Sequence, residues 1–144
     1  MFRHIAAAIA GAALSLLTTM AVEAAELKRW QGAHSGAQSP ATIVATDAEG
    51  WTKIWQLAGQ KPDTDFDPTR QSAVAVFLGQ RNTGGYAVNV VSMGVRQDRF
   101  VIVVDETTPG DRIVTQALTT PWLVLLLDRP EQPIEIEPRF RTNN

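Results

Sequence analysis

The chain has 144 residues, 44% hydrophobic and 19% charged, which predicts one domain with a packed core and argues against a disordered chain. Its formal net charge is -2, so it has no electrostatic reason to bind nucleic acid or an anionic membrane surface. Cysteine is absent, which excludes disulfides, thiol nucleophiles, thiolate metal sites and a lipidated N-terminal cysteine.

Residues 1–24 have the pattern of a secretory signal peptide. Arg3 lies in a short polar start, residues 5–22 are almost continuously apolar, and residues 22–24 put Val and Ala at the −3 and −1 positions of a cut after Ala24. The alternative is a membrane anchor, but the stretch is Ala-rich and only about as long as the ~20 apolar residues of a spanning helix. We therefore expect cleavage, a periplasmic or secreted protein, and no membrane insertion of the mature chain.

The segment after the leader, residues 25–41, is polar and rich in small residues. This composition predicts a flexible N-terminal segment, with room for a short strand over residues 27–30. We expect the folded domain to span residues 42–138 and to be followed by a tail at residues 139–144.

The one clear helix is expected after a short strand at residues 42–45. Asp47 suits the N-cap position, and Gly59 suits the end of the helix. The apolar side chains that recur at i, i+3, i+4 and i+7 are Trp51, Ile54, Trp55 and Ala58. The tryptophan pair could form a ligand platform, but the spacing favours anchoring of the helix to a core.

Alternating aspartates in the loop at residues 61–70 raise the question of calcium. They are Asp63, Asp65 and Asp67. A calcium loop of the helix-loop-helix type has Gly after the third aspartate and Glu at the twelfth position, where this chain has Pro68 and Val74. A solvated acidic loop is favoured, so we expect no metal and no cofactor, and keep a calcium or small-ligand module as an alternative.

Two β-rich runs flank a polar break that contains Gly84 and Gly85. The runs at residues 71–79 and 86–93 read as a β-hairpin, because glycines at the break allow the chain to reverse. A third strand is expected at residues 99–105, which is apolar on both faces and therefore central in its sheet.

Three more strands are expected towards the C-terminus. Residues 113–118 form a strand candidate, residues 122–127 are a continuous apolar run typical of a buried strand, and residues 133–137 alternate as in a half-exposed edge strand. The elements together predict an α+β fold with a predominantly antiparallel sheet. This sheet is a meander of five to seven strands, sandwich- or roll-like, backed by one amphipathic helix.

The side chains needed for catalysis are missing from the pattern. His34 is the one histidine after the leader and lies in the segment predicted to be flexible, which makes it a poor general base. Asp105 and Glu106 are adjacent on a strand end and point to opposite faces, so they cannot jointly flank one bond. We therefore expect a protein that is not an enzyme.

A resemblance to a known family adds to this interpretation. The segments that carry it are Trp51-Thr-Lys-Ile-Trp55, Asp65-Phe66, Ala75-Val-Phe-Leu-Gly79, Thr83-Gly-Gly-Tyr86-Ala-Val88 and Leu118-Thr-Thr-Pro-Trp122. In this order they resemble the C-terminal domain of the PrcB family, over about residues 47–136. The family consists of accessory subunits of secreted protease complexes, so the resemblance implies a non-catalytic partner that assists or stabilises a protease.

The residues expected to contact a protein partner, with a protease as the candidate, lie in three loops. They are Arg81, Asn82, Thr83, Gly84, Gly85 and Tyr86 at the tip, Pro109 and Gly110 in a turn, and Pro121 and Trp122. Asn82-Thr-Gly-Gly-Tyr86 and Pro121-Trp122 are also similar to loops of the chagasin-like cysteine-protease inhibitors, which are immunoglobulin-like sandwiches. That similarity leaves a loop-mediated protease inhibitor as the alternative function.

Overall fold

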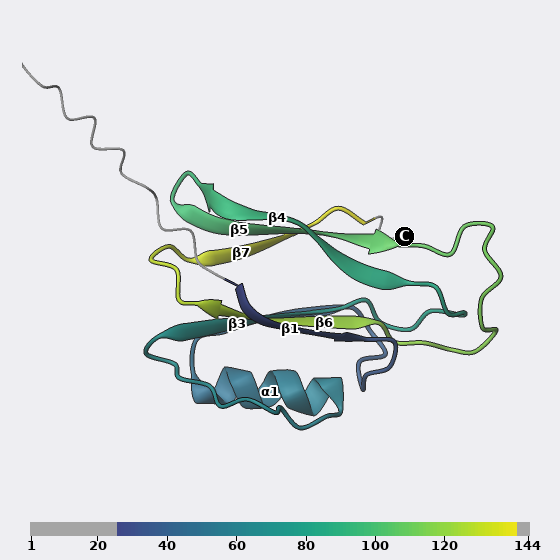
Figure 1. Cartoon of the computed structure of the whole chain (residues 1–144), viewed down its shortest axis with the longest axis horizontal. Coiled ribbons are helices and arrows are strands. Elements are labelled where there is room, and N and C mark those ends of the chain that lie inside the picture. The colour runs from purple at the N-terminus through teal and green to yellow at the C-terminus, as the bar shows by residue number, and fades with distance from the viewer. Residues whose placement is uncertain (1–25, 141–144) are drawn as a thin grey trace, which may run out of the picture.

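The strands form two sheets that pack face to face, and one helix covers the outer face of the larger sheet (Figure 1). The structure is a computed structural model, and it describes residues 26–140. The elements are β1 (Glu26–Gly32), β2 (Ala41–Ala45), α1 (Ala48–Ala58), β3 (Gln71–Phe77), β4 (Ala87–Arg96), β5 (Arg99–Thr107), β6 (Trp122–Asp128) and β7 (Ile134–Pro138). The larger sheet has the order β1-β6-β3-β2 and the smaller sheet β4-β5-β7. All pairs are antiparallel except β5 with β7, so the predicted fold class is confirmed.

The helix forms where its caps and apolar spacing predicted it. The Asp47 side chain accepts a hydrogen bond from the Gly50 N–H at 2.7 Å, which satisfies one of the free donors at the helix N-terminus. Gly59 ends the helix in the left-handed conformation with φ 73°. The buried face consists of Trp51, Ile54, Trp55 and Ala58.

An aromatic layer fills the space between α1 and the larger sheet. Trp55 contacts three other tryptophans edge to face, with ring centroids 5.0 Å from Trp30, 5.4 Å from Trp51 and 6.1 Å from Trp122. Phe66 stacks on Trp51 at 4.9 Å. Because Trp51 and Trp55 are both buried, they anchor the helix and do not form a ligand platform.

A second core lies between the two sheets and explains the continuous apolar run of β6. Leu123, Leu125 and Leu127 face the smaller sheet, whereas Trp122 and its alternate neighbours face the helix. Both faces of β6 are therefore buried, which confirms the buried strand expected at residues 122–127. β7 is an edge strand, as predicted for residues 133–137, and β5 is the central strand of its sheet.

The predicted hairpin around the two glycines is wrong. β3 pairs with β2 on one side and β6 on the other, so it has no free edge for β4. β4 pairs with β5 in the opposite sheet through a tight turn at Gln97, which has φ 56°. Residues 78–86 therefore carry the chain from one sheet to the other. The predicted meander is also replaced, because β4 and β5 form one antiparallel hairpin, β6 lies in the other sheet and β7 joins β5 in parallel.

Two further expectations are corrected. Residues 26–32 do not form a flexible segment, because β1 pairs with β6 along its whole length and forms an edge of the larger sheet. Residues 113–118 form no strand: the chain there is an irregular loop packed on residues 83–85. The predicted signal peptide, residues 1–24, and the end of the predicted tail, residues 141–144, lie outside the described residues. No helix in the described part is long and apolar enough to cross a membrane.

Candidate functional site

Two long connections meet at one end of the sandwich, and we call this region the loop end. It consists of residues 78–86, which cross between the sheets, and residues 108–121, which join β5 to β6 (Figure 1). Backbone hydrogen bonds tie the two together: Leu78 donates to Pro121, Arg81 and Thr119 exchange two bonds, and the Gly84 N–H donates to Thr115. The loop end is thus built into the sandwich by its backbone.

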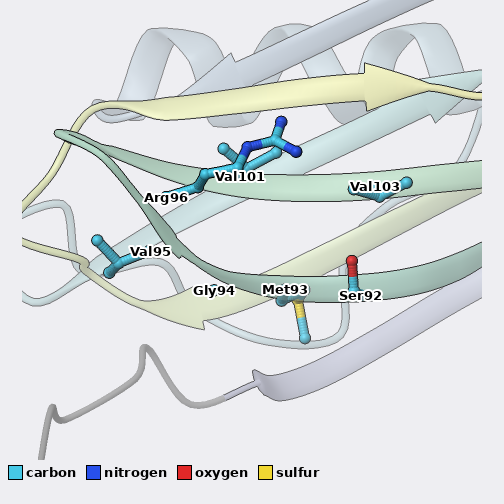
Figure 2. A pocket seen from close by; sticks show the side chains of 7 residues that line it. All are labelled: Ser92, Met93, Gly94, Val95, Arg96, Val101 and Val103. Carbon is cyan, nitrogen blue, oxygen red and sulfur yellow. The ribbon is translucent and has the colours of Figure 1, made fainter.

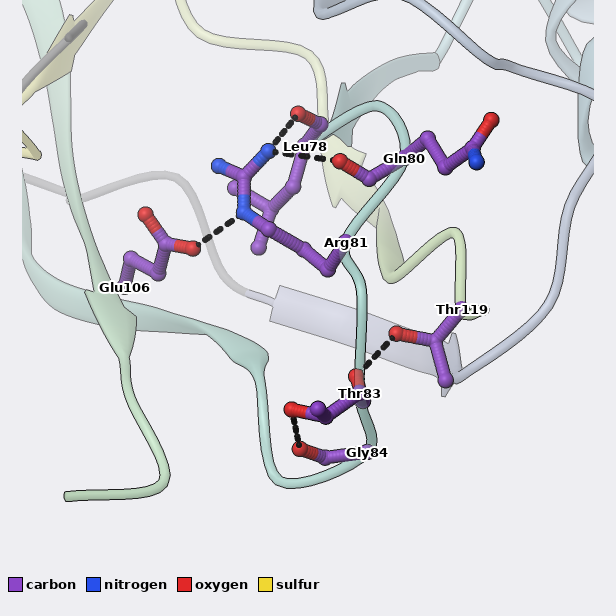
Figure 3. A network of polar contacts seen from close by, with 7 residues as sticks. All are labelled: Leu78, Gln80, Arg81, Thr83, Gly84, Glu106 and Thr119. Carbon is purple, nitrogen blue, oxygen red and sulfur yellow. Dashed lines mark hydrogen bonds and ion pairs between the residues drawn. The ribbon is translucent and has the colours of Figure 1, made fainter. Parts of the chain in front are cut away.

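Arg81 is the polar centre of the loop end (Figure 3). Its Nε donates to the Glu106 carboxylate at 2.7 Å, and its Nη1 donates to the backbone oxygens of Leu78 at 2.9 Å and Gln80 at 3.3 Å. The guanidinium also lies 5.7 Å from the centre of the Tyr86 ring. Only 23% of the Arg81 side chain and 9% of the Glu106 side chain are exposed. Arg81 therefore holds β5 and the crossing segment together, with its guanidinium turned inward to Glu106.

Two threonines before β6 add further internal bonds. The buried Thr119 donates from its Oγ1 to the Thr83 backbone oxygen at 2.8 Å. Thr120 Oγ1 donates to the Ser35 backbone oxygen at 2.9 Å and accepts from the Ser35 N–H at 2.6 Å. The loop end is therefore bonded both to itself and to the segment that follows β1.

The tip glycines allow the connection at residues 108–121 to lie directly on the tip. Gly85 has φ 86°, and a Cβ placed on it would lie 2.8 Å from Val114 Cγ1 and 2.9 Å from Pro109 Cβ. Arg112 closes the same contact, because its Nη2 donates to the Gly85 backbone oxygen at 3.2 Å and its Nε to the Pro109 backbone oxygen at 3.1 Å. The tip and the predicted Pro109-Gly110 turn therefore form one surface.

We expect Gly85→Ala to lower the free energy of unfolding by about 2 kcal/mol, from the left-handed backbone and the close contact together. The matched control is Gly110→Ala, where φ is also positive at 56° but nothing lies within 4 Å of an added Cβ. That control should cost about 1 kcal/mol. Urea unfolding of both variants measures the difference, and equal losses would mean that the contact at the tip is absent.

The predicted contact residues differ in exposure, and six of the ten are half-buried: Arg81, Thr83, Gly84, Gly85, Tyr86 and Pro109. Asn82 and Gly110 are exposed, whereas Pro121 and Trp122 are buried, and Trp122 packs in the aromatic layer. The prediction of a partner surface at Pro121 and Trp122 is therefore corrected, since a partner cannot reach them in this fold. This also removes one of the two loops that the chagasin-like alternative required.

The most exposed apolar side chains of the loop end were not predicted as contact residues. Ile113 is fully exposed at 103%, and Leu118 is 59% exposed. Both were assigned to a strand, because a run of β-branched and apolar residues is typical of one. The signal that indicates a loop for Ile113 and Leu118 is their position between two sets of turn residues, Pro109-Gly110 and Pro121.

In the loop at residues 61–70, Asp63 and Asp67 accept hydrogen bonds from protein groups. The Lys28 ammonium and then the Trp30 N–H donate to Asp63 at 2.8 Å and 3.1 Å, and the hydrogen bond from Lys28 is the main cause of the lowered pKa of Asp63. The Thr69 hydroxyl, followed by its backbone N–H, lowers the pKa of Asp67. Within residues 26–140 no three His, Cys, Asp or Glu side chains gather as metal ligands, so the calcium alternative gains no support.

The comparisons with known proteins agree with the resemblance found in the sequence. The model of the family described as PrcB C-terminal matches residues 72–128, from the start of β3 to the end of β6. No curated protein and no solved structure matches the chain. The matched part includes both connections of the loop end. Residues 72–128 are accordingly similar to the PrcB C-terminal domain.

Proposed function

We propose that this chain is an exported, non-catalytic domain that binds a protein partner through the loop end, as an accessory subunit of a protease complex. The observation that carries the proposal is Ile113, a large apolar side chain that is fully exposed on a loop held by hydrogen bonds. Leu118 exposes more than half of its surface on the same loop. Loops that a rigid scaffold holds in place carry binding residues more often than other parts of a protein surface, which supports this choice.

The bracing of the loop end favours binding physically. Association costs free energy when a loop must be ordered, and a loop that is already ordered avoids much of that cost. Here Arg112 holds the backbone before Ile113, and the two bonds between Arg81 and Thr119 hold the backbone after Leu118. The apolar side chains are therefore presented at a fixed spacing, so that a partner's pockets can receive them.

The choice of a protease as the partner rests on the family. The chain resembles the PrcB family, whose members are accessory subunits of secreted protease complexes. The match over residues 72–128 supports a role of that kind. The signal-peptide pattern at residues 1–24 supports an exported location. The lack of a suitable general base in the sequence supports a role without catalysis.

The decisive experiment compares the wild-type chain with Ile113→Asp/Leu118→Asp. We expect the double variant to fold normally and to bind its partner at least about tenfold more weakly, because each buried Leu or Ile side chain contributes about 1.5–3 kcal/mol. Crosslinking in the cell envelope followed by mass spectrometry identifies the partner, and binding of the purified pair then gives the affinity.

The control is Val44→Asp, which places one such charge on an exposed apolar residue of β2, away from the loop end. It should leave binding unchanged. If the double variant keeps every partner of the wild type at the same affinity, the loop end is not the contact surface. If the partner is a protease, titration of its activity distinguishes an accessory subunit, which preserves or raises activity, from the inhibitor that the chagasin-like similarity suggested.

A further inference from the structure

The four edge strands of the two sheets are not equally protected against pairing with another chain. Edge strands expose unpaired backbone N–H and C=O groups, and proteins protect them with charges, prolines, short length or bulges. β1 carries Glu26, Lys28 and Arg29 within seven residues. β2 has only five residues, and β7 also has five, with two glutamates and a terminal proline.

β4 is the exception among these edges. It has ten residues, and its first nine, from Ala87 to Val95, include no charged side chain and no proline. Within residues 26–140 it pairs with β5 on one side and with no strand on the other. Val91 and Val95 are 45% and 47% exposed. The protecting feature within this stretch is a bulge between Val90 and Ser92, which bends the strand locally and leaves Val91 outside the ladder with β5.

The space beside β4 is also open on the outer face of the smaller sheet. A hollow of about 240 Å³ lies there, and Figure 2 shows the side chains around it. Its floor includes the buried Val101 and Val103 of β5, and Gly94 on β4 contributes no side chain to fill it. Outward-facing side chains of a neighbouring strand would find room in this hollow.

We propose that β4 pairs antiparallel with β4 of a second copy of this chain, which joins the two smaller sheets into one sheet across a two-fold axis. A strand paired with itself places residues of one uncharged segment opposite residues of the same segment, so no like charges meet between Ala87 and Val95. Two-fold pairing uses the β4 edge of both copies. No β4 edge then remains free for a third copy, so the assembly stops at a dimer. It also covers Val91 on both copies, which a monomer leaves half exposed.

A cysteine scan tests the pairing directly, because the chain has no cysteine of its own. Single cysteines are placed at Asn89, Val91, Ser92 and Gly94 of the full chain, with Val44→Cys on the β2 edge as control. Opposite Cα atoms in an antiparallel pair lie about 4.5–5.5 Å apart, which is within the span of a disulfide, whereas positions away from the axis are too distant from their own copies. We expect mild oxidation to crosslink one position, or two adjacent ones, much faster than the control.

Sedimentation velocity of the unmodified chain gives the second readout. From about 1 to about 100 μM the fraction of dimer should rise with concentration, as mass action requires. Val91→Lys should weaken the dimer by at least about tenfold, because it places two positive charges near the axis, while far-UV circular dichroism stays unchanged. A monomer at every concentration overturns the proposal, as does equal crosslinking at all four positions and the control. A dimer that Val91→Lys does not weaken also overturns it, and neither result bears on partner binding at the loop end.

Discussion

Replacing Trp55 by alanine should lower the free energy of unfolding by about 3–5 kcal/mol, which is the usual cost of removing a large aromatic side chain from a core. Trp55 is only 4% exposed and lies at the centre of the aromatic layer, in edge-to-face contact with Trp30, Trp51 and Trp122. Truncation leaves a cavity that its rigid aromatic neighbours cannot fill. Urea unfolding followed by circular dichroism measures the loss.

The best control for Trp55 is phenylalanine. Among residues 26–140 no group accepts a hydrogen bond from the buried Trp55 Nε1, so the indole already bears the cost of an unsatisfied polar group. Trp55→Phe removes that group and part of the volume, and the two effects offset each other to leave a loss under about 1.5 kcal/mol. A loss as large as that of the alanine variant would mean that the indole N–H makes an important bond, and the packing account would then fail.

The helix and its buried face could be predicted from sequence because their signals are local. Asp47, Gly59 and the apolar spacing between them lie within one short segment, and each has a single physical meaning at its position. The strand at residues 122–127 could also be predicted, since a short apolar run bounded by turn residues is typical of a buried strand. These elements establish the α+β class and the single helix.

The partner strands of β3 could not be predicted, because strand pairing is decided by contacts between segments that are distant in the sequence. Two strands joined by glycines usually form a hairpin. β3, however, is buried on both faces and is flanked by β2 and β6, and β6 lies about fifty residues later in the chain. The same limit explains β1. Its polar composition predicts flexibility, but the segment forms a strand because it pairs with β6, which lies far later in the chain. Lys28 and Trp30 also bond to Asp63, more than thirty residues away.

The sequence predicted the loops of the candidate site, but not which of their side chains are exposed. The tip and the Pro109-Gly110 turn do come together, because each carries turn residues at the same end of the sandwich. Their side chains point differently from the expectation: Arg81 turns inward to Glu106, and the most exposed apolar side chain of the loop end is Ile113. A sequence gives residue types and local turns, but it does not show which side chains of a loop point inward.

Arg81→Met should lower the free energy of unfolding by about 3 kcal/mol, because it leaves the Glu106 carboxylate largely buried without its cation and frees two backbone oxygens. Methionine keeps most of the length of the side chain, so the loss reports the polar contacts more than the volume. The matched control is Arg99→Met, whose partner Glu135 lies 3.7 Å away with both side chains more than half exposed. That variant should cost no more than about 1 kcal/mol.

The double variant Arg81→Met/Glu106→Met separates the ion pair from its surroundings. Replacing both partners by apolar side chains removes the uncompensated charge, so the double variant should be more stable than Arg81→Met alone. Urea unfolding of the three variants completes the comparison, and NMR of the Gly84 and Gly85 amides shows whether the tip stays in place. If Arg81→Met costs no more than Arg99→Met, then backbone bonds alone hold the loop end. In that case partner binding through Ile113 should survive the loss of Arg81.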